Sequence, residues 1–179
     1  AFSYAGQRIG MMIISDELYD RSYPNLKNYY TKDLFGHSMI YGSIYSMSAG
    51  ISHSAQYALA AIFKAANDGK LNFVEEVKEY GEKAKIMKKL FTDNGFKIVY
   101  DKDEDEPIAD GFYFTFSFPG YSGEELLNEL LYYGISAISL AITGSERLEG
   151  IRACVSLVRR DQFKDLEFRL KKFNADHQN

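Results

Sequence analysis

Phenylalanines at every second position of one short segment constrain the fold of this chain more than any other feature of its sequence. They are Phe112, Phe114, Phe116 and Phe118. The residues between them are Tyr113, Thr115 and Ser117. Successive side chains of a β-strand point to opposite faces of its sheet, so this pattern predicts a strand with one face in the core. Helices are expected to cover that apolar face.

Helical periodicities precede and follow this strand. From Asn72 to about Asn94, apolar residues recur at alternating intervals of four and three. This spacing predicts a long helix of roughly 22 residues, about 33 Å in length. Ser122 and Glu125 have the spacing of a capping box, which predicts another helix that ends near Gly134.

Shorter patterns complete the predicted elements. Apolar runs predict strands over residues 8–14, 96–100, 135–142 and 151–158. Helical spacing predicts a helix over residues 52–66 and a last helix that Asp161 caps. Residues 15–50 are rich in Tyr, Ser, Gly and Asn, and this composition favours mostly irregular structure.

This order of elements predicts an α/β chain. In this interpretation residues 95–179 form one small α+β unit, a small sheet covered by helices. The long helix joins that unit to residues 1–70.

Composition limits the expected partners. The 179 residues include 21 Lys and Arg against 25 Asp and Glu, a net charge of −4, so the electrostatic footprint of a nucleic-acid binder is missing. No apolar run approaches the roughly 18 residues that a membrane span needs, so no membrane partner is expected. The single cysteine, Cys154, excludes an intramolecular disulfide framework and favours a reducing cytoplasm.

Other reactive residue types form no recognisable site. The three histidines lack metal-ligand spacing and are expected at the surface or at helix caps; they are His37, His53 and His177. The acidic stretch 101–106 begins like a calcium loop, but Glu106 stands where that loop needs Gly and Phe112 where it needs Glu. Cys154 has no base beside it in the sequence. The sequence therefore predicts no metal site and no catalytic cysteine.

Arg152 is a charged residue among apolar and small neighbours. Within residues 151–158 the alternation predicts a core face that comprises Ile151, Ala153, Val155 and Leu157. Arg152 then lies on the opposite face with Cys154 and Ser156. Desolvating an arginine is costly unless an anion meets it, and its planar fork suits a carboxylate. A structural salt bridge or an arginine that faces water fits this pattern equally well.

The first residues of the chain carry a second arginine in a short motif. Gly6-Gln7-Arg8-Ile9-Gly10 has the form Gly-x-Arg-x-Gly. It resembles a segment of the class I and II aminotransferases, which are fold type I enzymes that depend on pyridoxal phosphate (PLP). In those enzymes the segment follows the Schiff-base lysine. That segment reads Ser-x-x-Lys, five residues, then this motif. Two later segments also resemble this family, a small-domain turn at Asp110-Gly111-Phe112-Tyr113 and a late arginine-bearing strand at Gly150-Ile151-Arg152-Ala153-Cys154-Val155-Ser156.

The resemblance covers essentially the whole chain and implies its organisation. It makes residues 1–70 a remnant of the large cofactor-binding domain, residues 71–94 a long interdomain helix, and residues 95–179 the small C-terminal α+β domain. It implies that Arg8 binds the PLP phosphate and that Arg152 binds the α-carboxylate of the substrate. The Schiff-base lysine would immediately precede Ala1, so no catalytic residue is expected within this chain. An Ala in place of an initial Met also favours a piece of a longer protein.

The implied reaction transfers an amino group between an amino acid and a 2-oxo acid, with PLP as the electron sink. Without the lysine, this chain alone is expected to be inactive and not to bind PLP. Members of this family are usually homodimers, so the resemblance also implies a homo-oligomer. Two alternatives stay open: an aminotransferase-like ligand-binding domain of a transcription regulator, and a PLP-dependent lyase or synthase on the same fold, since fold alone does not fix function.

Overall fold

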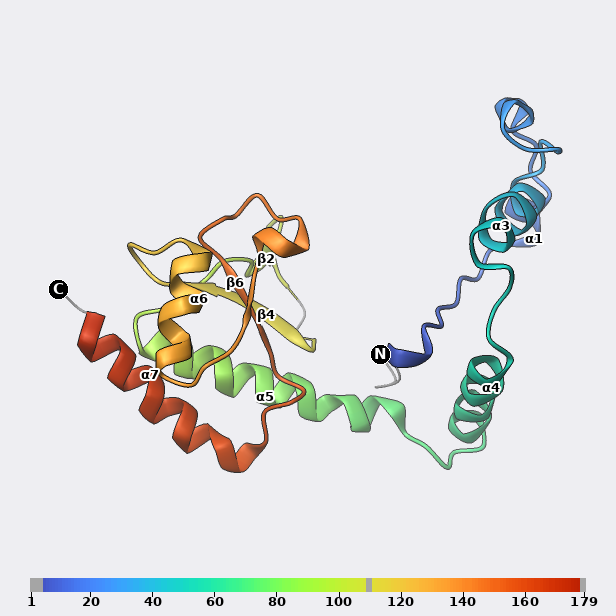
Figure 1. Ribbon diagram of the computed structural model, residues 1–179. Coiled ribbons are helices and arrows are strands. Elements are labelled where there is room, and N and C mark those ends of the chain that lie inside the picture. The colour runs from blue at the N-terminus through green and yellow to red at the C-terminus, as the bar shows by residue number, and fades with distance from the viewer. Residues whose placement is uncertain (1–4, 109–110, 178–179) are drawn as a thin grey trace. The chain divides into compact units, whose positions relative to one another are not determined.

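The computed structural model describes residues 5–108 and 111–177 (Figure 1). The chain divides into two compact units, residues 1–72 and residues 73–179. No helix within the described ranges is both long enough and apolar enough to cross a lipid bilayer.

Short helices build the first unit. They are η1 (Ala5–Gln7), α1 (Asp16–Tyr19), η2 (Pro24–Asn28), α2 (Phe35–His37), η3 (Ser38–Ile44), α3 (Tyr45–Ser48) and α4 (His53–Asn67). Of these, η1 and η2 are 3-10 turns and η3 is a π-helical segment. The helix predicted over residues 52–66 is confirmed by α4.

The strand predicted over residues 8–14 is not formed. Residues 8–15 are neither helical nor extended in a sheet, and Met11, Met12 and Ile13 are exposed. A strand requires a partner for its backbone N–H and C=O groups. Among the described residues of the first unit, the strand-type pairing is limited to an isolated bridge between Ser22 and Leu34. The prediction was wrong because an apolar run by itself supplies no partner.

Residues 35–48 are more regular than their composition predicted. Here α2, η3 and α3 follow one another without a break. The hydroxyls of Ser46 and Ser48 donate to the carbonyls of Gly42 and Ile44, each at 2.7 Å. Because serine can bond back to its own helix in this way, a Ser-rich segment can be helical without the usual periodicity.

The second unit is a small antiparallel sheet with helices on one face. Its described residues form four strands in the spatial order β1 (Lys97–Ile98), β4 (Tyr113–Ser117), β6 (Ile151–Cys154) and β5 (Ile138–Ser139). The helices are α5 (Phe73–Asp93), α6 (Gly123–Tyr132) and α7 (Phe163–His177), with the 3-10 turns η4 (Ala141–Thr143) and η5 (Arg160–Gln162). A separate hairpin pairs β2 (Lys102–Asp103) with β3 (Glu106–Pro107). The predicted fold class, α/β with a small sheet covered by helices, is confirmed.

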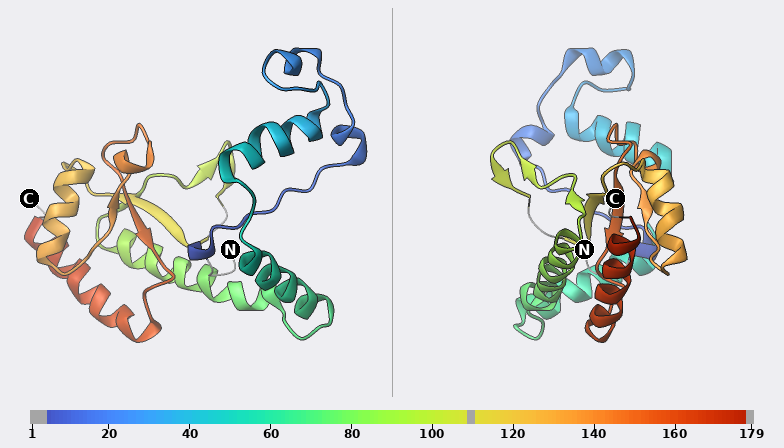
Figure 2. Two further views of the ribbon diagram at one scale, coloured as in Figure 1. Left: turned by 45° about the vertical axis from the view of Figure 1, so that its right-hand side comes forward. Right: turned by 90° about the vertical axis from the view of Figure 1, so that its left-hand side faces the viewer.

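The core of the second unit lies between this sheet and its helices. Phe114, Phe116 and Phe118 are buried, as their alternation predicted. From α5, the Phe91 ring lies 4.2 Å from that of Phe116, centroid to centroid. The helices α5 and α7 lie side by side along this face (Figure 2), and Phe173 of α7 is fully buried there. The long helix is therefore part of the core of the second unit.

The predicted capping box starts α6. The Ser122 hydroxyl accepts a hydrogen bond from the Glu125 amide, and the Glu125 carboxylate accepts one from the Ser122 amide. The next residue, Gly123, lies so close to the chain before β6 that a Cβ there would stand 2.5 Å from the Gly150 carbonyl oxygen. The start of α6 is thereby fixed against the start of β6.

Strands β5 and β6 are shorter than predicted. After Cys154 the chain leaves the sheet toward η5, and the side chain of Leu157 is 85% exposed. The prediction that Leu157 shares the core face was therefore wrong, since the alternation of faces applies only while the chain stays paired. Likewise Ile142 lies exposed in η4 rather than in a strand.

Candidate functional site

Strand β6 places Arg152 on the face of the sheet that the helices leave open. Its neighbours Ile151 and Ala153 are buried in the core beneath the sheet, so alternation turns Arg152 to the other face. In the ladder Arg152 lies opposite Thr115 of β4 and Ile138 of β5. The open face of the second unit thus has a guanidinium near its centre.

The ring of Tyr113 lies under this guanidinium. The central carbon of the Arg152 group is 4.3 Å from the ring centroid. Tyr113 pairs with Cys154 across β4 and β6, which makes it a diagonal neighbour of Arg152 on the same face. The electron-rich ring face attracts the cation. The contact therefore restrains the plane of the guanidinium.

The Arg152 side chain has no hydrogen-bond acceptor among the described residues. Its Nε atom is buried and without a partner. A buried N–H group that lacks an acceptor costs on the order of 1–3 kcal/mol. A carboxylate accepts two parallel N–H bonds from such a fork, so a carboxylate ligand would remove that cost. The salt bridge that the sequence left open is absent from the described part of the chain.

The polar groups beside Arg152 in the ladder are neutral. The Thr115 hydroxyl accepts a hydrogen bond from the Tyr100 amide at 2.9 Å. The Cys154 sulfur lies 3.0 Å from the Ser156 hydroxyl oxygen. Neither group carries a negative charge, so these neighbours do not neutralise Arg152, and an anionic ligand could.

Arg8 belongs to the first unit and lies in an exposed, irregular segment. Its backbone has a left-handed φ of 52°. A Cβ added at Gly6 or Gly10 would meet open space. Arg8 has an interaction partner within the chain. The lysine expected before Ala1 lies outside this sequence.

The histidines and acidic residues form no metal site in the described ranges. His177 lies at the end of α7, where its Nδ1 atom is 2.8 Å from the Phe173 carbonyl oxygen. His37 contacts the ring of Tyr41. The acidic stretch around Glu104 forms the turn of the β2–β3 hairpin.

Sequence reasoning missed Tyr113 as part of this site. Its alternation with the phenylalanines indicated only that it faces away from the core. The contact with Arg152 depends on the register of β4 against β6, and two strands far apart in the chain carry no signal of that register in one sequence.

Of three comparisons with known proteins, the one with solved structures found similar chains. No protein-family model matches the chain, and no curated protein matches it. Among solved structures, it resembles LysN, the α-aminoadipate aminotransferase of Thermus thermophilus, complexed with N-(5'-phosphopyridoxyl)-L-leucine. The TM-score is 0.60 at 14% sequence identity, over 80% of this chain and 37% of that chain. A second structure, of a NifS-like protein, is 25% identical over 57% of this chain and 29% of that chain, with a TM-score of 0.38.

The likeness to LysN defines the fold. The chain has the fold of part of the LysN chain and spans 37% of the length of that neighbour. At 14% identity the likeness shows the fold alone. The reaction has to be argued from the residues of the site.

Proposed function

We propose that this chain is the arginine-bearing part of a PLP-dependent aminotransferase and that Arg152 binds the α-carboxylate of its amino-acid and 2-oxo-acid substrates. The observation that carries the proposal is the buried Nε atom of Arg152, which has no acceptor among the described residues. The guanidinium lies on the open face of the sheet and is restrained by Tyr113. These features suit a planar anionic group that approaches from outside the second unit.

In this proposal the residues of the chain bind and orient. The Nε–H and one Nη–H of Arg152 donate to the two carboxylate oxygens, which fixes the position of the substrate and one plane through it. Tyr113 keeps the fork from rotating. Holding the substrate by its carboxylate places the neighbouring Cα–H bond in a defined direction, which contributes to the rate by orientation.

The described residues around Arg8 do not by themselves form a phosphate site. A phosphate cradle needs several converging N–H donors, whereas the backbone at Gly6 and Gly10 borders open space. We therefore propose only that Arg8 contributes one cation to a phosphate site whose other groups lie outside this chain. The lysine that precedes Ala1 in the proposal lies outside it as well.

The upstream sequence tests the family assignment. The proposal requires that the gene encode Ser-x-x-Lys directly before Ala1. Any other residue at the lysine position would refute the assignment.

Activity tests the role of Arg152. The 179-residue chain should not transaminate, whereas the longer protein with the lysine should. In that longer protein, Arg152→Ala should raise KM strongly for amino acids. Arg160→Ala, which removes an arginine already paired with Glu79 and Glu82, should not. An unchanged KM in Arg152→Ala would show that another group binds the carboxylate.

A homo-oligomer is the remaining part of the proposal. Met11, Met12 and Ile13 are each more than half exposed, and contiguous exposed apolar side chains favour association. Light scattering of the 179-residue chain should therefore show a species larger than a monomer. A monomer at all concentrations would argue against this part.

A further inference from the structure

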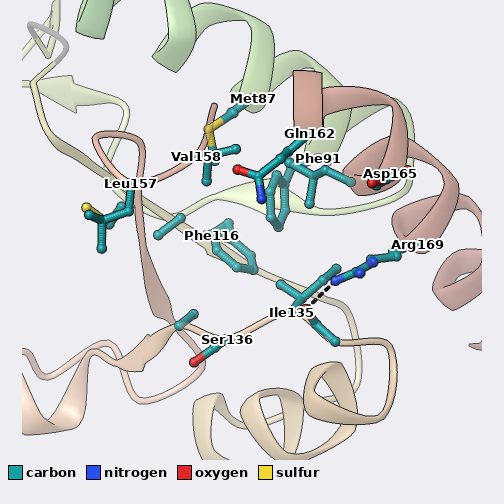
Figure 3. A pocket seen from close by; sticks show the side chains of 15 residues that line it. Met87, Phe91, Phe116, Ile135, Ser136, Leu157, Val158, Gln162, Asp165 and Arg169 are labelled. Atoms are coloured by element: carbon teal, nitrogen blue, oxygen red, sulfur yellow. Dashed lines mark hydrogen bonds between the residues drawn. The ribbon is translucent and has the colours of Figure 1, made fainter. Parts of the chain in front are cut away.

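A cavity of about 230 Å³ lies in the second unit, where Phe116 and Ala153 of the sheet and Phe91 of α5 line it (Figure 3). Phe91 and Phe116 line it and are almost completely buried. Met87 and Val158 extend its apolar wall, and Ser136 lies at its edge. A cavity of about 150 Å³ lined by apolar side chains is known to hold benzene, so this one has room for a single aromatic ring or a branched aliphatic chain.

The cavity exists because the edge strand separates from the sheet. Strand β5 pairs with β6 at Ser139–Ile151 and Ile138–Arg152, and the pairing stops there. Continued further, the same register would pair Ser136 with Cys154, and both residues line the cavity instead. Residues 134–137 and 155–158 are not paired with each other, and residues of both segments line the cavity.

Gln162 presents a fixed donor to this space. Its Oε1 atom accepts a hydrogen bond from the Arg159 amide at 2.9 Å. Because a backbone N–H requires an acceptor, the oxygen must occupy that place and the Nε2 group is the free end of the amide. No described residue accepts a hydrogen bond from this Nε2, and Figure 3 shows the amide turned toward the cavity.

Arg169 supplies a charge at the same cavity. Its Nη1 atom donates to the Gly134 carbonyl at 2.6 Å, which fixes the guanidinium beside the opening. The other N–H groups of Arg169 have no acceptor among the described residues. Asp165, an exposed residue one helical turn earlier on α7, is the acidic group of the lining.

We propose that this cavity binds a small apolar monocarboxylate. Its ring or branched chain would contact Phe91, Phe116 and Met87, and its carboxylate would accept hydrogen bonds from Gln162 and Arg169. Such a ligand matches an apolar interior bordered by two hydrogen-bond donors, one of them charged. Neither Arg152 nor Tyr113 lines this cavity, so the site is distinct from the one that contains them, and it does not rest on the proposed aminotransferase function.

Phenylacetate is the probe, titrated into the 179-residue chain and followed through the methyl NMR signals of Met87 and Ile135. Saturable shifts of these signals are expected. Phenethylamine, which has the same ring and the opposite charge, should bind at least about tenfold more weakly. Equal binding of both probes, or no saturable shift with phenylacetate, would overturn the proposal.

Gln162→Glu gives the sharpest variant, because the Glu side chain can still accept from the Arg159 amide and so keep the turn. It replaces the free donor by a second carboxylate oxygen, and phenylacetate binding should fall about tenfold or more. Asp165→Asn, which removes a nearby negative charge, should strengthen it. Unchanged binding of phenylacetate in Gln162→Glu would overturn the proposal that Gln162 binds the carboxylate of the ligand.

Two further variants locate the ligand. Ala137→Leu places extra side-chain volume in the wall of the cavity and should abolish the shifts. Arg152→Met should leave them unchanged. Loss of the shifts in Arg152→Met with retention in Gln162→Glu would place the ligand on the open face and refute the cavity site.

Discussion

The guanidinium of Arg152 is stacked on the ring of Tyr113 at 4.3 Å, while its Nε atom is buried and no residue that the structure describes accepts a hydrogen bond from it. The ring holds the side chain in place but satisfies none of its hydrogen bonds. An arginine in this state is oriented before any ligand arrives, which reduces the conformational entropy that binding a carboxylate would cost.

The stacked ring should matter for binding through its aromatic face and not through its hydroxyl. In the longer protein of the proposal, Tyr113→Leu should raise KM for amino acids between about twofold and about thirtyfold, the range of a cation–π contact. Tyr113→Phe keeps the ring and should leave KM unchanged. Steady-state kinetics of both variants measure the difference, and an equal effect of the two would disprove a role for stacking.

Phe91 should be a main contributor to the stability of the second unit. Its ring contacts those of Phe96, Phe114 and Phe116, and it is 1% exposed. Phe91→Ala should lower the free energy of unfolding by about 3–5 kcal/mol. The matched control is Phe168→Ala on α7, where the ring is 68% exposed and the change should be small. Urea denaturation compares them.

The stabilisation that the ion pair between η5 and α5 provides should depend on pH. The Arg160 guanidinium donates to the Glu79 carboxylate through Nε at 2.8 Å and Nη2 at 2.6 Å. This hydrogen bonding lowers the pKa of Glu79 from its usual 4.5 and raises that of Arg160. Both side chains are about half exposed, so solvent screening keeps the effect modest.

Because the pKa of Glu79 is depressed in the folded state, its stabilising effect is complete above about pH 4.5 and is lost as the pH falls below that value. Glu79→Gln should therefore be less stable than the wild type at pH 7, with a difference that shrinks in acid. Denaturation curves at pH 7 and pH 3 test this. A difference that is constant with pH would contradict the ionic origin.

Tyr133 should make the alkaline stability of the chain pH-dependent. Its hydroxyl donates to the Asp176 carboxylate at 2.8 Å. Burial, together with this bond to a negative group, raises the pKa of Tyr133 from 10.0 to about 12. A raised pKa means that the stabilisation is complete below pH 10 and is lost between pH 10 and pH 12.

Tyr133→Phe removes both the bond and its titration. The wild type should be more stable than Tyr133→Phe at pH 8, and the two should converge by about pH 12, the folded-state pKa. Thermal melts across this range measure the gap. A gap that widens as the pH rises would reverse the sign and exclude the explanation.

Local patterns in the sequence determined the elements whose signals are complete within a few residues. The Phe alternation of β4, the capping box of α6 and the period of α5 all identified their elements correctly. Each depends on the geometry of one strand or one helix, which neighbouring residues fix by themselves. The apolar runs at residues 8–14 and 151–158 failed in whole or in part because pairing needs a second strand.

Arg152 could be singled out from the sequence because desolvating a charged residue in an apolar strand costs free energy unless an anion pairs with it. Its actual neighbours were decided by the tertiary structure. The register of β4 against β6 brings Tyr113 under the guanidinium and no carboxylate of the described residues near it. The separation of β5 from β6 likewise opens the cavity beside Gln162. Both depend on contacts between residues far apart in the chain, which no local pattern encodes.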